Sequence, residues 1–184
     1  MNIQAAIAQV VAGQSLSRAD METVMRTVMQ GEATEAQIGG LLAGLRMKGE
    51  TIDEIVGAAS VMRSLATPVD IDTDGLIDLA GTGGDGANLF NVSTAATFVV
   101  AGAGGRIAKH GNRSVSSSSG SSDVLSALGV DLSVSPAAIS DSIASIGVGF
   151  MFAPMHHSAM KHAIGPRQQL AMRTIFNVLG PLTN

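Results

Sequence analysis

The chain has 184 residues, a formal net charge of −4, no cysteine and a hydrophobic fraction of 46%. The absence of cysteine excludes disulfide bonds, catalytic thiolates and cysteine-ligated zinc, and the acidic balance disfavours a nucleic-acid-binding protein. Residues 1–11 lack the basic region and cleavage site of a signal peptide, and the longest apolar runs, such as residues 95–105, are short and interrupted by glycine. These features predict a cytoplasmic globular protein.

Residues 1–66 predict four amphipathic helices that end at glycines and form a small bundle or a partner-binding layer. Apolar side chains recur there at spacings of three and four, and we interpret the methionines among them as core residues. The expected apolar faces are Ile3, Ala6, Ile7, Val10 and Val11; Met21, Val24, Met25 and Val28; Ile38, Leu41, Leu42 and Leu45; and Ile55, Ala58, Ala59, Met62 and Leu65. Thr34 with Gln37 and Thr51 with Glu54 are capping-box patterns, which predict where the third and fourth helices begin.

After a connector over residues 67–75, the period of the pattern changes. The expected elements are a strand over 76–80, a helix from about Ser93, a strand over 106–109, a helix over 123–128, a helix from Ser135 and Pro136 to about Gly147, and a strand over 149–153. Strands that alternate with helices predict a mostly parallel sheet, and ligands bind such sheets beyond the carboxyl ends of the strands.

A glycine-rich loop, GTGGDG at residues 81–86, follows the first strand. Glycines let backbone N–H groups approach phosphate oxygens, and Asn91 to Thr94 then open a helix whose N-terminus favours an anion. The Ser93 hydroxyl is an oxygen of the kind that Mg²⁺ binds together with substrate phosphates. An ordinary strand-to-helix turn capped by Ser93 is an equally good interpretation of this loop taken alone, and a P-loop is excluded because the Gly-Lys-Ser/Thr ending is missing.

A second loop, KHGNRSVSS at residues 109–117, follows the second expected strand. Lys109 and Arg113 beside a glycine turn suit phosphate or pyrophosphate. The alternative is a flexible serine-rich linker, which the segment resembles in composition. Ser121 is interpreted as the cap of the next helix, as a ligand contact, or as both.

The histidines and the remaining basic residues carry weaker signals. His156, His157 and His162 do not have the spacing of a zinc site, so a structural role is expected. Lys161 is expected to be a solvated helix residue. Arg167 is of the type that pairs with a carboxylate, although nothing local in the sequence demands this role.

Several long stretches, in this order along the chain, resemble the anthranilate phosphoribosyltransferase family. They are GEATEAQIGGLLAGLRMKGET (31–51), GTGGDG (81–86), FNVSTAA (90–96), KHGNRSVSS (109–117), SGSSDVLSALG (119–129), FAP (152–154), HSAMK (157–161) and RTIFNVLGPLTN (173–184). The resemblance covers the entire chain and is more specific than any single glycine loop.

The resemblance implies a fold and an activity. The fold would be a helical domain over 1–66, a connector over 67–75, an incomplete α/β domain of the nucleoside phosphorylase/phosphoribosyltransferase type over 76–164, and a helical segment over 165–184 that returns to the helical domain. The activity would be transfer of the phosphoribosyl group of phosphoribosyl pyrophosphate (PRPP) to the amino group of anthranilate in tryptophan biosynthesis. The partners would be these two substrates and a second copy of the chain bound through the helical domain, with no nucleic acid and no membrane.

The resemblance also implies binding residues, but no catalytic nucleophile. The residues expected to bind PRPP are Gly81, Gly84, Asp85, Asn91, Val92, Ser93, Thr94, Lys109, His110, Gly111, Asn112, Arg113, Ser114, Val115, Ser116, Ser117 and Ser121. Gly81, Asn112 and Arg167 would bind anthranilate, with Arg167 facing its carboxylate. Ser93 would ligate one of two Mg²⁺ ions, and the acidic ligands of the other would lie beyond residue 184.

Two departures from the family pattern qualify these expectations. Leu89 stands where many members carry a hydroxyl side chain against PRPP. Members also continue for about as many residues again, so the chain is expected to be an N-terminal portion with weak or no activity alone. The alternatives are an enzyme like pyrimidine-nucleoside phosphorylase, and a non-catalytic nucleic-acid-binding relative of the same fold.

Overall fold

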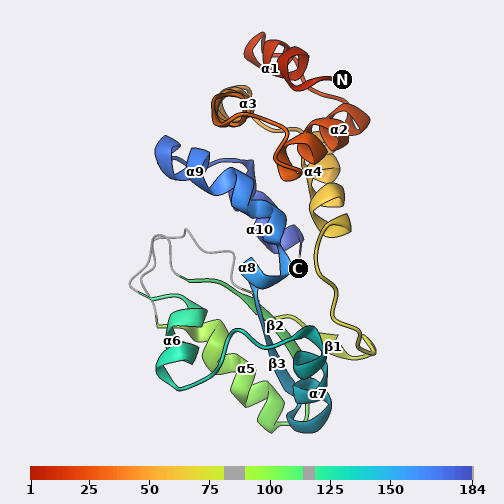
Figure 1. The fold of residues 1–184 in the computed structure, drawn as a ribbon. Helices are drawn as coiled ribbons and strands as arrows, with labels where there is room; N and C mark the ends of the chain where they lie inside the picture. Colours follow the sequence, from red (N-terminus) through yellow and green to blue (C-terminus); the bar gives the residue numbers. More distant parts are fainter. Residues whose placement is uncertain (81–89, 114–118, 184) are drawn as a thin grey trace. The chain divides into compact units, whose positions relative to one another are not determined.

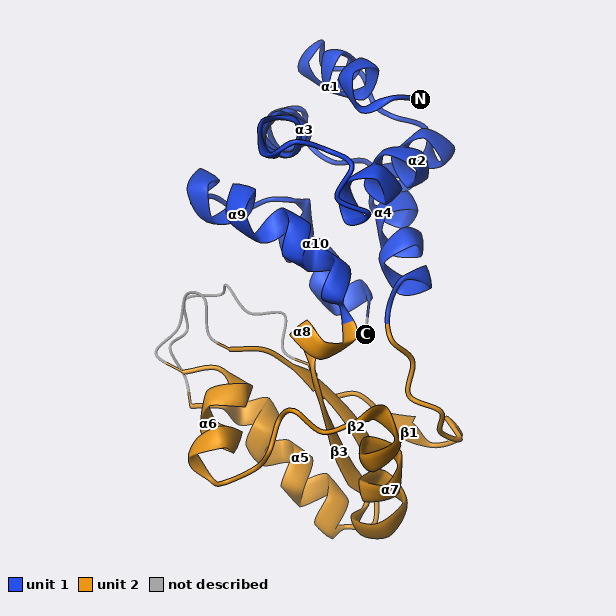
Figure 2. Ribbon diagram, viewed as in Figure 1, with its two compact units in different colours: residues 1–66, 157–184 blue, residues 67–156 orange. Residues whose placement is uncertain are grey.

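The computed structural model describes residues 1–80, 90–113 and 119–183, and the chain divides into two compact units. The first unit comprises residues 1–66 and 157–184, and the second comprises residues 67–156 (Figures 1 and 2). Within the described part of the chain, no helix combines the length and the apolarity that crossing a membrane requires.

The first unit is helical. Its elements are α1 (Ile3–Val11), α2 (Arg18–Met29), α3 (Glu35–Lys48), α4 (Ile52–Ser64), the 3₁₀ turn η1 (Ser158–Met160), α9 (Lys161–Leu170) and α10 (Ile175–Leu182). The faces predicted for α2 and α3 are fully buried in its core. The prediction for Val11 was wrong, because the buried stripe of α1 runs through Ile3, Ala6 and Val10, while Val11 is 70% exposed at the end of the helix.

Both predicted capping boxes are present and set the starts of α3 and α4. Thr34 accepts a hydrogen bond from the Gln37 N–H, and the Gln37 side chain accepts one from the Thr34 N–H at 2.9 Å. In the second box, the Glu54 carboxylate accepts the Thr51 N–H at 2.8 Å. Each box satisfies backbone donors that the first turn of a helix leaves without intrahelical partners.

Glu54 also joins three segments of the helical unit inside its core. The carboxylate is fully buried and accepts hydrogen bonds from the Leu16 N–H and from the Lys48 ammonium, both at 2.9 Å. Burial raises the pKa of Glu54, but the hydrogen bonds that the carboxylate accepts outweigh burial and leave this pKa below its ordinary value. The group is therefore a buried carboxylate with every neighbour arranged to stabilise its charge.

The second unit is built on a three-stranded parallel sheet with the strands in the order β1-β2-β3. Its elements are β1 (Leu76–Ile77), α5 (Val92–Gly102), β2 (Arg106–Gly111), α6 (Ser121–Ala127), α7 (Pro136–Ile146), β3 (Val148–Phe152) and α8 (Ala153–His156). In register, Ile77 lies opposite Ile107, and Ala108 lies opposite Gly149. One helical unit and one unit with a parallel α/β sheet confirm the predicted fold class.

Alternation along β2 places the flanking helices on opposite faces of the sheet. Ala108 packs against Ile139 and Ile143 of α7. The next residue, Lys109, extends to Ser93 at the start of α5. Because successive side chains of a strand point to opposite faces, α5 and α7 cover opposite sides of β2.

The strand predicted over residues 76–80 is shorter than expected. Pairing between β1 and β2 ends after Ile77. A backbone donor further along β2, the N–H of His110, instead bonds to the Asp78 carboxylate at 3.1 Å. The Asp78 side chain thus replaces a backbone hydrogen-bond partner of β2 at the point where the pairing of the two strands has ended.

The first and last residues of the second unit, Thr67 and His156, are hydrogen-bonded to each other. The Thr67 N–H donates to the His156 carbonyl at 2.8 Å, and His156 Nδ1 lies 3.0 Å from the Thr67 carbonyl oxygen. His156 is 5% exposed and therefore has a structural role, as predicted.

Replacing Glu54 with alanine is expected to lower the free energy of unfolding by about 3–5 kcal/mol, because it leaves the Lys48 ammonium and two backbone N–H groups buried without their acceptor. Urea unfolding followed by circular dichroism measures this loss. Glu22→Ala is the control, since Glu22 pairs with Arg18 on the surface and its removal costs about 0.5 kcal/mol. Equal losses in the two variants would contradict the importance of the buried network.

Candidate anion-binding site

Part of the predicted site lies outside the described residues. This holds for Gly81, Gly84, Asp85, Ser114, Val115, Ser116 and Ser117. The described PRPP residues all belong to the second unit, and Arg167 belongs to the first. The described part of the predicted PRPP site therefore consists of strand ends and helix starts of the second unit.

Lys109 is the central charged residue at the end of β2. Its side chain is 2% exposed, and its ammonium donates to the Leu79 carbonyl at 2.6 Å and to the Ser93 hydroxyl at 3.3 Å. Burial lowers the pKa of Lys109, and the Asp78 carboxylate opposes this shift. Among the described residues no carboxylate forms an ion pair with the ammonium. A desolvated cation held by neutral oxygens suits an anionic ligand.

The start of α5 contributes a second feature that favours an anion. Asn91 is the N-cap residue, yet its side chain makes no cap hydrogen bond. Its amide instead donates to the Ser119 carbonyl at 3.3 Å and accepts from the Ser119 hydroxyl at 3.1 Å. The interpretation of Ser93 as the cap is therefore wrong, because Ser93 is the second residue of the helix and its hydroxyl faces Lys109. The helix dipole at this uncapped N-terminus favours negative charge.

Thr94 adds a hydroxyl to the same helix start. The side chain is 3% exposed, and its oxygen has no hydrogen-bond partner among the described residues. A buried polar atom of this kind costs free energy unless a ligand or water satisfies it.

The second loop leaves the sheet at Gly111, where the backbone lies very close to two neighbouring side chains. A Cβ on Gly111 would lie 2.7 Å from the Phe150 ring and closer still to the Ser121 hydroxyl. Gly120 is the N-cap of α6, so the interpretation of Ser121 as the cap is wrong. Ser121 lies directly against the strand end, where only glycine leaves room for its hydroxyl.

The two described residues of this loop that follow Gly111, Asn112 and Arg113, contact α6. The Asn112 carbonyl accepts the Ser122 N–H at 3.3 Å. Arg113 is two-thirds exposed and lies 3.8 Å from the Asp123 carboxylate. Asp123 also accepts the Gly120 N–H at 2.8 Å and so holds the start of α6. The Arg113 guanidinium thus lies on the surface beside the strand end and has one acidic neighbour.

The described residues do not form a complete metal site. No group of three or more histidine, aspartate or glutamate side chains gathers among them. The predicted ligand Ser93 offers one hydroxyl oxygen, which already accepts a hydrogen bond from Lys109. One neutral oxygen suits Mg²⁺ only as a supplement to ligands that a phosphorylated substrate brings.

Arg167 has an environment of its own in the helical unit. Its guanidinium carbon lies over the Phe176 ring, 5.3 Å from the ring centroid. Burial lowers the pKa of Arg167. Sequence reasoning missed Phe176, because residues 167 and 176 lie on different helices and no periodic pattern connects them. It also missed Asp78, although a carboxylate directly after an apolar strand was a usable signal.

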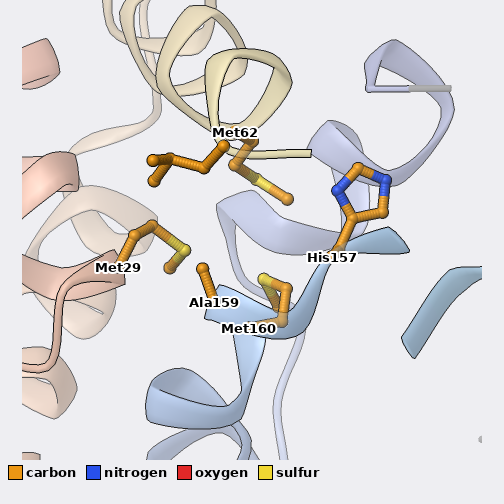
Figure 3. Close-up of a pocket in the computed structure, with 6 residues that line it drawn as sticks. Met29, Met62, His157, Ala159 and Met160 are labelled. Atoms are coloured by element: carbon orange, nitrogen blue, oxygen red, sulfur yellow. The ribbon is translucent and has the colours of Figure 1, made fainter. Parts of the chain in front are cut away.

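A separate apolar pocket lies in the helical unit. Met29, Met62, Leu65, His157, Ala159 and Met160 line it (Figure 3). Thioether and aliphatic groups dominate this lining, which differs from the polar, cationic strand ends of the second unit. Met29 and Met62 are buried, as the interpretation of the methionines as core residues predicts, but this interpretation was wrong for Met47, which is 88% exposed.

Comparison with known proteins is consistent with this geometry. The chain matches the glycosyl transferase family, a/b domain, over residues 73–184, and the helical bundle domain of the same family over residues 4–66. It is 67% identical over 184 residues to the anthranilate phosphoribosyltransferases of Teredinibacter turnerae and Cellvibrio japonicus. The match covers all of this chain and 54% of each of these relatives, so the chain spans about half of their length.

Solved structures give the same result. Anthranilate phosphoribosyltransferase from Thermus thermophilus superposes with a TM-score of 0.90 at 44% identity, over 97% of this chain and 54% of that one. The Saccharomyces cerevisiae enzyme in complex with PRPP and Mg superposes with a TM-score of 0.88 at 29% identity, over 98% of this chain and 54% of that one.

Replacing Gly111 with alanine is expected to lower the free energy of unfolding by about 1–3 kcal/mol, because the new methyl group would displace the Ser121 hydroxyl and the Phe150 ring. Thermal unfolding measures this change. The matched control is Gly102→Ala near the end of α5, where the added Cβ meets nothing within 4 Å. The control should be neutral or slightly stabilising, and a Gly111 variant that behaves like it would contradict the close approach.

Proposed function

Since the chain belongs to the glycosyl transferase family, we propose that it transfers the phosphoribosyl group of PRPP to the amino group of anthranilate. The products are N-(5-phosphoribosyl)anthranilate and pyrophosphate, and the reaction belongs to tryptophan biosynthesis. The single observation that carries this proposal is the buried ammonium of Lys109, a β2 residue that contacts the start of α5. This ammonium has hydrogen bonds but no ion-pair partner among the described residues.

The reaction matches the chemistry of these residues. Departure of pyrophosphate from C1 of the ribose develops positive charge on the sugar and negative charge on the leaving group. The Lys109 ammonium and the N-terminus of α5 are fixed donors that stabilise the leaving group, and fixed donors in a dry site need no reorganisation during the reaction. The rest of the rate acceleration comes from positioning the two substrates, and no protein nucleophile is required.

We assign the two substrates to different residues. Asn91 to Thr94, Lys109 to Arg113 and Ser121 bind PRPP, together with the predicted residues of the two loops that lie outside the described ranges. Gly81, Asn112 and Arg167 bind anthranilate, and Arg167 faces its carboxylate. The enzyme acts in the cytoplasm as a homodimer formed through the helical unit, and the exposed Met47 and Ile52 of that unit support the dimer.

Mg²⁺ enters this proposal together with PRPP. The S. cerevisiae enzyme is described in complex with PRPP and Mg. When bound, the ion supplies positive charge to the departing pyrophosphate. Among the described residues, the Ser93 hydroxyl would hold this ion, together with oxygens of the phosphorylated substrate. The acidic ligands of the other of the two ions would lie beyond residue 184.

Calorimetric titration of the chain with PRPP in excess Mg²⁺ tests the site. Saturable binding is expected, and Lys109→Met should weaken it at least about tenfold, because a hydrogen bond to a charged group contributes about 1.5–3 kcal/mol. The fold should survive, since the substitution replaces a buried cation by an apolar side chain of similar length. Lys161→Met, at an exposed lysine of the helical unit, is the matched control and should bind like wild type. Equal affinity of the two variants, or no binding by the folded wild type, would sink the proposal.

Activity is tested in a chimera in which this chain replaces the matching part of the T. turnerae relative. With PRPP, Mg²⁺ and anthranilate, the chimera is expected to consume anthranilate, which is followed by its fluorescence. Lys109→Met in the chimera should abolish most of the turnover. Phosphorolysis of thymidine or uridine without consumption of anthranilate would instead favour the nucleoside phosphorylase alternative.

A further inference from the structure

Arg167 is a half-buried cation without an acidic partner in the part of the chain that the structure describes. Among residues 1–80, 90–113 and 119–183, no carboxylate lies within ion-pair distance of its guanidinium. Burial is the sole cause of the lowered pKa of this side chain. A guanidinium that loses hydration without gaining a carboxylate is destabilised unless a ligand supplies the negative charge.

The acidic side chain that faces α9 lies on the wrong side of the helix for Arg167. The Gln169 amide donates to the Glu35 carboxylate of α3 at 3.4 Å. Residues two apart on a helix point about 200° away from each other around its axis. Glu35 therefore lies toward one side of α9, and Arg167 projects from the other.

The group that Arg167 does contact is an aromatic face. The Phe176 ring is 5% exposed, and its neighbours on α10, Ile175 and Leu179, are fully buried. Core packing fixes the orientation of the ring. A ring face attracts a cation without neutralising its charge, so the contact with Phe176 leaves the positive charge of Arg167 in place. The N–H donors of an arginine bind a carboxylate in the bidentate geometry.

We propose that Phe176 is a positioning residue that holds the Arg167 guanidinium ready for a carboxylate ligand. The identity of this ligand rests on the proposed function, in which the carboxylate is that of anthranilate. Holding the long side chain in place before binding reduces the conformational entropy that the ligand must overcome. The aromatic face thus contributes to affinity for one substrate without touching it.

The first test observes the contact without any ligand. In ¹H–¹⁵N spectra the Nε–Hε resonance of Arg167, assigned by its loss in Arg167→Lys, is expected to lie upfield of the other arginines because of the ring current. Phe176→Leu should return it to their position. Leu179→Met, a volume-conserving change at a fully buried position of the same helix, should leave it unmoved. Phe176→Met replaces the leucine variant if that variant does not fold. A resonance unmoved by loss of the ring would overturn the proposal.

The second test uses the chimera described above. Phe176→Leu is expected to raise the KM for anthranilate about fivefold, as about 1 kcal/mol of cation–π interaction implies, with kcat and the KM for PRPP unchanged. Methyl anthranilate, which lacks the charge, should bind wild type and variant equally. An equal rise in the KM for PRPP would point to general damage and overturn the proposal. A chimera that ignores anthranilate would refute the proposed function, and the ligand-free resonance would still decide the role of Phe176.

Discussion

The second unit depends on one physical constraint: an ammonium group placed at the end of a strand and withdrawn from water. Lys109 reaches this position because alternation along β2 turns it toward α5, opposite to Ala108. Once there, it needs oxygen partners, and the Leu79 carbonyl and the Ser93 hydroxyl supply them. Three further features lie near this cation. They are the end of the pairing between β1 and β2, the hydrogen bond from β2 to Asp78, and the start of α5, whose N-cap side chain makes no cap hydrogen bond.

In the helical unit, a buried lysine does have a carboxylate partner. The Lys48 ammonium, 6% exposed, is neutralised by Glu54, which three further donors surround. A fully paired charge of this kind stabilises a fold and leaves no attraction for an outside anion. Lys109 and Arg167, in contrast, are held by a carbonyl, a hydroxyl and an aromatic ring. Within the described residues, the chain thus contains one buried lysine paired with a carboxylate and two cations held by neutral groups.

Much of the fold followed from local patterns in the sequence, because it rests on short-range causes. The capping boxes at Thr34 and Thr51, the proline start of α7 and the glycine end of the same helix are interactions within a few residues. The errors arose where distant residues compete. Ser93 is not the cap of α5, because the helix already begins at Val92 and the Ser93 hydroxyl accepts a hydrogen bond from Lys109, 16 positions away. Residue 80 is not in a strand, because Asp78 takes a donor from β2. The pairing of Arg167 with Phe176 crosses the turn between two helices, which periodicity within one helix does not reveal.

The bonds between Thr67 and His156 have a consequence for how the molecule is assembled. They join the points where the chain enters and leaves the second unit. The roughly 90 residues of this unit therefore form a loop that is closed at its base. An insertion whose two ends meet leaves the host polypeptide with a gap that a few residues can bridge. The second unit thus has the chain geometry of an inserted domain, which enters and leaves its host at one point.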